Sequence, residues 1–268
     1  MDTKKIIKKF KTLNILNLVL FVVLLFVFIF LDKDVLTLLF PNAKFKGFSF
    51  SLTMLFAFLT TILYFTINFS IQMSISKILT KNCDPVTYKT VYFALSPKNN
   101  RIGKRMIEIT AEFMQGNFDI AKTLCYDVIK NENNLSLRQT AYLTLCQIFL
   151  LENDVESLNY LRQSVIPAKN TSTKNGVVYG QIENTATVYI EFLTGDSTNM
   201  LKCYEKAREL CKNKCDLYIS LYYYALALLK NNRDEEAMPI FEEIMNNANG
   251  LFVANFAKRA LLYYATVE

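Results

Sequence analysis

Cysteine is the residue type in this chain with the clearest potential for metal or redox chemistry. Of the six cysteines, three lie close together in the sequence: Cys203, Cys211 and Cys215. No Cys-x-x-Cys pair occurs and the chain has no histidine, so a zinc ion would need a fourth ligand such as Cys125, Cys146 or Asp216. We therefore expect no metal site, and we interpret the thiols as buried structural groups.

The absence of histidine also restricts catalysis. Without an imidazole, the Ser-His-Asp and Cys-His nucleophiles and the histidine general bases are excluded. The sequence has no phosphate-binding glycine loop and no dinucleotide-binding glycine pattern. The acidic run Asp234–Glu235–Glu236 is typical of a helix amino terminus, where it meets the positive end of the helix dipole. We therefore expect neither an enzyme nor a bound cofactor.

A dense aromatic cluster is formed by tyrosines at positions 218, 222, 223 and 224. Tyr218 and Tyr222 are four residues apart and share one helix face, where they could form an exposed aromatic strip that binds a protein partner. The alternative is that both rings pack against a neighbouring helix. Packing is the favoured interpretation, and Tyr218 and Tyr222 are kept as candidate partner-binding residues.

Two uncharged apolar stretches lie near the amino terminus, Thr12–Leu31 and Gly47–Ser76. They determine where the cysteines and tyrosines of the remaining chain lie relative to a membrane. Each is long enough to cross about 30 Å of hydrocarbon as a helix, which takes roughly 20 residues. We predict a transmembrane hairpin over residues 1–76, with helices at about 12–31 and 48–72 and a turn near Pro41–Asn42. The alternative for the first stretch is a cleaved signal peptide, but no small-x-small cleavage site follows Leu31.

The flanks of the two stretches differ in charge. Twelve lysines and arginines lie before the first stretch or directly after the second, whereas three lie between the stretches. This bias predicts that both termini, and the whole region after the hairpin, face the cytoplasm. We expect an integral protein of a bacterial cell membrane, which contacts lipid through both helices and their basic flanks.

One face of the second stretch carries small and polar residues spaced three or four apart: Thr53, Ala57, Thr60, Tyr64 and Asn68. Such residues promote helix association in lipid, where apolar side chains gain nothing by leaving the solvent. The face either holds the hairpin together or docks against another membrane protein. No charged residue lies within either stretch, so an ion pathway is not indicated.

The net charge also differs between the two parts of the chain. Residues 1–105 carry 15 Lys/Arg and 4 Asp/Glu, whereas residues 106–268 carry 15 Lys/Arg and 20 Asp/Glu. The basic character therefore belongs to the membrane-proximal part, in which residues 77–100 are predicted to form a basic juxtamembrane linker. The acidic remainder is a poor match for a phosphate backbone, so no nucleic-acid partner is expected.

From residue 101 to residue 268 the apolar residues recur with a helical period, and a unit of two helices repeats. Turns within the pairs are expected at residues that tolerate a left-handed backbone or cap a helix: Gly116, Glu152–Asn153, Gly195–Asp196 and Asn231–Asn232. The second helices are predicted at about 119–130, 155–165, 198–211 and 234–245, and the stretch 251–265 is expected to close the stack. Helix pairs of this kind bury their apolar faces by stacking on their neighbours.

The fourth pair carries the clearest family pattern, with Leu221, Tyr224, Ala225 and Leu228 on its first helix and Ala237, Phe241 and Ile244 on its second. Together with the segment Gly116–Ala121 of the first pair, these positions resemble the tetratricopeptide repeat family over roughly residues 101–247. The resemblance implies an all-α solenoid in which the first helices of the pairs line a concave groove for a peptide or a helix.

These features predict a membrane-anchored, non-catalytic cytoplasmic adaptor or scaffold that binds protein partners. Tethering to a membrane raises the local concentration, so even modest groove affinities would be productive. The alternative is an accessory subunit of a membrane complex, in which the transmembrane hairpin makes the functional contacts and the repeats provide stability.

Overall fold

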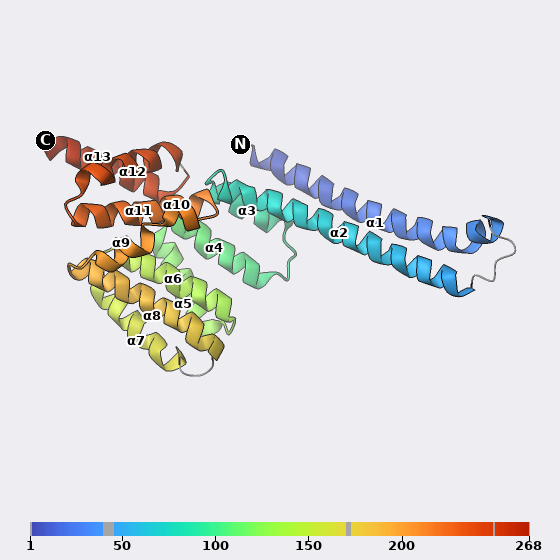
Figure 1. Cartoon of the computed structure of the whole chain (residues 1–268), viewed down its shortest axis with the longest axis horizontal. Helices are drawn as coiled ribbons and strands as arrows, with labels where there is room; N and C mark the ends of the chain where they lie inside the picture. Colours follow the sequence, from blue (N-terminus) through green and yellow to red (C-terminus); the bar gives the residue numbers. More distant parts are fainter. Residues whose placement is uncertain (1, 40–45, 170–172, 249, 268) are drawn as a thin grey trace. The chain divides into compact units, whose positions relative to one another are not determined.

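The computed structural model describes the backbone of residues 2–39, 46–169, 173–248 and 250–267, and the side chains of residues 2–27, 55–169, 173–248 and 250–266. Within these ranges the regular secondary structure is entirely helical, with no strand (Figure 1). The predicted all-α class is therefore confirmed. The chain divides into two compact units, Met1–Ser76 and Lys77–Glu268.

The first unit consists of α1 (Thr3–Leu39) and most of α2 (Lys46–Thr80), which lie side by side (Figure 1). The buried residues of the pair are separated by four, seven or eleven positions, which correspond to one, two or three helical turns: Phe10 and Asn17 on α1, and Thr60, Ile71 and Ile75 on α2. This spacing places them along one side of each helix, so the two helices pack face to face. The other sides expose apolar residues.

Both helices are longer than the predicted spans of 12–31 and 48–72. Helix α1 starts in the lysine-rich flank, because lysine is a good helix former and neither glycine nor proline interrupts the segment. The segments Thr3–Val27 and Leu55–Thr80 are long and apolar enough to cross a membrane. The turn predicted near Pro41–Asn42 lies outside the described residues.

The second unit is a series of packed helices. Their bounds are α3 (Pro85–Leu95), α4 (Arg101–Gln115), α5 (Phe118–Asn131), α6 (Leu135–Leu151), α7 (Val155–Lys169), α8 (Thr173–Thr194), α9 (Thr198–Tyr204), α10 (Ala207–Leu210), α11 (Lys214–Lys230), α12 (Asp234–Asn247) and α13 (Phe252–Val267). The helix pairs predicted from the sequence correspond to α4–α5, α6–α7, α8 with α9 and α10, and α11–α12. Each pair packs against the first helix of the next pair, and the last pair packs against α13 through α12.

Two of the predicted helix bounds are corrected. Helix α7 continues through Pro167 to Lys169, because a proline near the carboxyl end removes only one backbone N–H from the last turns. The helix expected over residues 198–211 is interrupted after Tyr204 and resumes as the short α10.

The predicted basic linker over residues 77–100 is also corrected, because it belongs to the second compact unit and contains α3. The Asp84 side chain caps α3 by accepting a hydrogen bond from the Thr87 backbone N–H at 2.9 Å, and Pro85 occupies the first turn. Helix α3 packs against α4, and Lys89 forms an ion pair with Glu112. Lys89, one of the cations that predict the membrane orientation, thus also links α3 to α4.

The first helix of each pair ends in the same way. The turn residues Gly116, Asn153, Gly195 and Asn232 have φ values of 82°, 57°, 126° and 55°. In every case the next residue donates its backbone N–H to the carbonyl five positions earlier: Asn117 to Glu112, Asp154 to Phe149, Asp196 to Glu191 and Arg233 to Leu228. This hydrogen-bond pattern is the Schellman motif, which satisfies carbonyls that the helix end leaves free. The turn positions predicted from glycine and asparagine are therefore confirmed.

The last helix, α13, connects the fourth pair back to the first. It packs against α12, and its Phe252 ring lies 5.2 Å from the Phe113 ring and 5.3 Å from the Phe118 ring, measured between ring centroids. The Phe256 ring lies 6.2 Å from that of Phe118. The series of pairs therefore closes on itself through an aromatic cluster.

Candidate functional site

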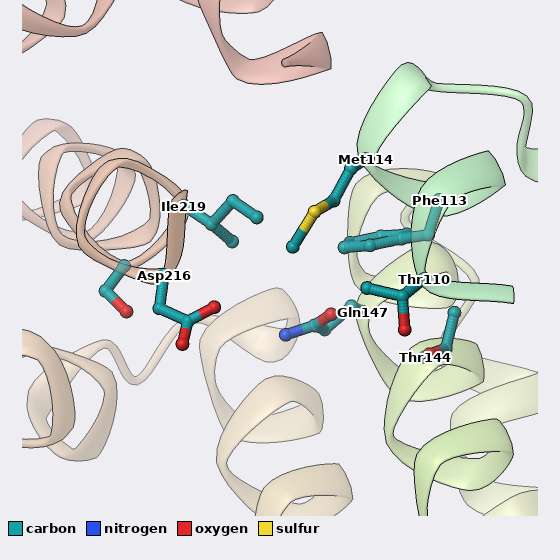
Figure 2. Close-up of a pocket in the computed structure, with 8 residues that line it drawn as sticks. Thr110, Phe113, Met114, Thr144, Gln147, Asp216 and Ile219 are labelled. Atoms are coloured by element: carbon teal, nitrogen blue, oxygen red, sulfur yellow. The ribbon is translucent and has the colours of Figure 1, made fainter. Parts of the chain in front are cut away.

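The second unit encloses a pocket of about 260 Å³ between α4, α6 and α11, which we call the inner pocket (Figure 2). These three helices are the first members of the first, second and fourth pairs. The pocket is lined by Thr110, Phe113, Met114, Thr144, Gln147, Asp216, Ile219 and Ser220. The residues from each helix are spaced three or four apart, so each helix turns one continuous face toward the pocket.

One side of the inner pocket is apolar. Phe113 and Met114 on α4 and Ile219 on α11 are buried, and Figure 2 shows Met114 and Ile219 pointing toward one another from the two helices. Phe113 is also part of the aromatic cluster with Phe252. The closure of the helix series therefore fixes the apolar wall of the pocket.

The other side of the inner pocket carries hydrogen-bonding groups. Figure 2 shows the Gln147 amide between Asp216 on one side and Thr110 and Thr144 on the other. Among the described residues, the side chains of Thr110, Thr144 and Gln147 have no hydrogen-bond partner. Ser220 accepts a weak bond from the Cys211 thiol, with sulfur and oxygen 3.6 Å apart. These groups are thus available to a ligand that enters the pocket.

Asp216 is the only ionisable residue among the described ones that line the inner pocket. The Asn213 amide donates to its carboxylate at 2.5 Å, and the Asp216 backbone N–H donates to the Asn213 side chain at 2.9 Å, which caps α11. A neutral amide partner leaves the negative charge uncompensated. The pocket therefore offers neutral donors and acceptors, one carboxylate and an apolar wall, which suits binding of a partly apolar segment.

Sequence reasoning did not identify Thr110, Thr144, Gln147 or Ser220 as candidates, and it considered Asp216 only as a zinc ligand. One signal was present for two of them. Thr144 and Gln147 are polar residues three positions apart on α6, in an otherwise apolar run from Ala141 to Leu151. Polar residues that share a face within a buried helix indicate either a buried hydrogen bond or a lined cavity.

The tyrosines predicted to bind a partner, Tyr218 and Tyr222, are both buried and do not form an exposed strip. The Tyr222 ring lies 6.0 Å from the Phe241 ring and 6.0 Å from the Phe256 ring, and burial raises the pKa of Tyr222 to about 12. Of the two interpretations, the structure therefore shows the packed one. The physical reason is that α12 and α13 cover this side of α11.

The cysteines do not gather into one cluster. Cys125 and Cys146 are buried in the core, and burial raises the pKa of each thiol to about 12. The Cys215 thiol donates to the carbonyl of Leu79 at 2.8 Å, whereas Cys203 is exposed. Among the described residues, no group of three or more His, Cys, Asp or Glu side chains is placed to hold a metal ion.

The polar face of α2 lies against α1 within the first unit. Thr60 is buried, and Ala57, Tyr64 and Asn68 are half-buried, whereas the side chain of Thr53 lies outside the described residues. The Asn17 amide of α1 donates to the Tyr64 carbonyl at 3.3 Å, and the Phe21 and Tyr64 rings lie 4.8 Å apart. These contacts correspond to the hairpin-stabilising interpretation of the face.

The chain matches no family model, no curated protein and no solved structure. The resemblance to tetratricopeptide repeats therefore stays a prediction. What the protein does has to be inferred from its own residues and their arrangement.

Proposed function

We propose that this chain is a non-catalytic, membrane-anchored helical adaptor, and that its inner pocket binds a segment of a protein partner. The observation that carries the proposal is that the Thr110, Thr144 and Gln147 side chains, which have no hydrogen-bond partner among the described residues, face the same pocket as the apolar wall of Phe113 and Met114. A polypeptide segment offers both matching parts, because its backbone supplies N–H and C=O groups and its side chains supply apolar surface.

The size of the inner pocket favours a short segment over a cofactor. Sites for drug-sized ligands and cofactors usually enclose about 300–1,000 Å³, and the inner pocket measures about 260 Å³. The Asp216 carboxylate, which faces no cation within the pocket, would add a preference for a segment that carries a lysine or an arginine. Such an ion pair would form at the rim, where its main effect is on specificity.

The anchor is proposed from α1 and α2. Their apolar lengths fit a bilayer, and five lysines precede the apolar part of α1: Lys4, Lys5, Lys8, Lys9 and Lys11. With the cations that follow the second span, they support the orientation in which both termini and the second unit face the cytoplasm. The repeated helix ends and the tetratricopeptide-like positions of the fourth pair support a helical-repeat adaptor.

The test is photo-crosslinking of the full-length protein in its native membrane, with a benzophenone amino acid in place of Ser220. We expect a crosslinked protein partner, and we expect the crosslink to disappear when Gln147→Trp fills the pocket. Gln163→Trp, on the exposed surface of α7, is the matched control and should leave the crosslink intact. A crosslink that survives Gln147→Trp in a variant with an unchanged melting curve would overturn the proposal, as would the absence of any partner.

A second candidate is an accessory subunit that works through its hairpin. The favouring observation is that Phe58, Phe65 and Phe69 are exposed and lie on one side of α2, away from the face that packs on α1. Replacing all three with leucine preserves apolarity but removes a shaped surface. Loss of function in this variant, with crosslinking from Ser220 unchanged, would favour the accessory subunit over the adaptor.

A further inference from the structure

A second cavity of the Lys77–Glu268 unit lies between α5, α6 and α7, and we call it the outer groove. It measures about 340 Å³, and its principal lining residues are Tyr126, Lys130, Tyr142, Phe149, Tyr160 and Leu161. None of these residues lines the inner pocket. The outer groove combines the second helices of the first two pairs with one side of α6, whereas the inner pocket is formed by first helices alone.

The outer groove has a buried apolar floor and an exposed aromatic rim. Phe149 and Leu161 are buried, as is the Tyr142 ring, which packs edge-on against Tyr179. At the rim, Tyr126 is 52% exposed and Tyr160 is 77% exposed. Exposed tyrosines beside a desolvated apolar depression are typical of the residues that dominate the energy of protein–protein contacts.

The charge of the lining residues indicates which kind of partner fits the outer groove. Lys130 is the only charged side chain of its lining, and no carboxylate in the described part of the chain pairs with it. Two other cations of the first helix pair are already paired, Lys122 with Glu152 and Arg105 with Asp127. A ligand carboxylate near Lys130 would therefore gain a favourable interaction without breaking an existing ion pair.

We propose that the outer groove binds a segment of a second protein, in which an aliphatic or aromatic side chain lies next to an aspartate or glutamate. The apolar side chain occupies the floor between Tyr126 and Tyr160, and the carboxylate pairs with Lys130. This inference goes beyond the adaptor function assigned to the inner pocket. The second unit then has two binding surfaces that prefer opposite charges. The inner pocket, with Asp216, prefers a basic segment, and the outer groove, with Lys130, prefers an acidic one.

The test uses the full-length protein in lipid nanodiscs and a phage library of random 12-residue peptides, with empty nanodiscs as the background. We expect enrichment of peptides that combine an apolar residue with Asp or Glu. Synthetic copies of the enriched peptides should bind at least tenfold more weakly to Tyr160→Ala and to Lys130→Glu. A new selection on Lys130→Glu should enrich Lys or Arg in place of the acids, which reports the charge contact directly.

Two controls keep the experiment decisive. Lys212→Glu makes the same charge change at another exposed lysine and should leave peptide binding unchanged, and Tyr160→Phe should retain most of it. Because Lys130 and Tyr160 are exposed, their substitution should not alter the melting curve. Failure to enrich acidic peptides, or binding that is insensitive to both substitutions, would overturn the inference. It would also be overturned by a dimer that dissociates in Tyr160→Ala, since the occupant would then be a second copy of the chain.

Discussion

A Cβ atom placed on Gly116 would lie 3.1 Å from the Cβ atom of Phe252. The turn at the end of α4 therefore packs directly against the first residue of α13. Gly116 also has a φ of 82°, which residues other than glycine adopt at a cost. Glycine is thus favoured at this position both by the helix end and by the closure of the helix series.

The first prediction separates these two requirements. Gly116→Ala should lower the free energy of unfolding by more than Gly116→Asn. Both variants place a Cβ atom 3.1 Å from that of Phe252, but asparagine tolerates the left-handed backbone, as Asn153 and Asn232 do at the same turn position with φ values of 57° and 55°. Alanine carries in addition a backbone penalty of roughly 1–2 kcal/mol. Denaturant titration of the two full-length variants in detergent measures the difference, and the loss that remains in Gly116→Asn reports chiefly the contact with Phe252. A Gly116→Asn variant as stable as the wild type would mean that α13 shifts without a cost in stability.

The second prediction concerns the aromatic closure. Phe252→Ala removes a buried ring that contacts both Phe113 and Phe118, so it should cost about 3–5 kcal/mol. Proteolysis within α13 should accelerate, because the helix loses its attachment to the first pair. Tyr263→Ala, in which the ring is 66% exposed on the same helix, serves as the control. Similar proteolysis rates in the two variants would contradict the closure.

The third prediction is a pH dependence at Glu112. Burial opposes the charged form, but hydrogen bonds from the Lys89 ammonium and, at 2.7 Å, from the Asn117 amide outweigh it and lower the pKa of Glu112 below its ordinary value. Since the unfolded chain then binds the proton more tightly, this contribution to stability is complete above the unfolded pKa of about 4.3 and is lost as the pH falls through the lower folded pKa.

The wild-type protein should therefore lose more stability than Glu112→Gln when the pH is lowered from 5 to 3. Thermal unfolding at several pH values measures the two slopes. Glu209→Gln, at an exposed position of α10, should keep the wild-type slope. If Glu112→Gln also keeps it, the ion pair with Lys89 does not contribute to folding.

The fourth prediction uses the thiols to test both burial and orientation. With a pKa of about 12, only about one in ten thousand of the Cys125 and Cys146 thiols is ionised at pH 8, and both are buried. An alkylating reagent should therefore modify exposed Cys203 first and these two only after unfolding. In intact cells a membrane-impermeant maleimide should leave Cys203 unmodified until the cells are lysed. Modification before lysis would place the second unit outside the cytoplasm.

Consecutive residues were sufficient to predict the helical class, the two apolar helices and the turns at Gly116, Gly195 and Asn232. The reason is that backbone preference and hydropathy act over one or two helical turns, so a glycine or an asparagine after an apolar helix is informative in isolation. The same local logic failed at residues 77–100. There the basic side chains suggested a linker, whereas the N-cap at Asp84, the proline in the first turn and the burial of Val91 produce a packed helix.

The tertiary structure alone decided which faces of the helices meet. Tyr222 appeared available for a partner because its covering rings, Phe241 and Phe256, belong to later helices whose orientation no local pattern specifies. The inner pocket likewise joins Thr110, Gln147 and Asp216 from three separate pairs. Such contacts depend on the rotation between successive pairs, which the packing of many side chains determines together. The sequence alone therefore determined the helices and their ends, and the packing decided which surfaces remain free to bind.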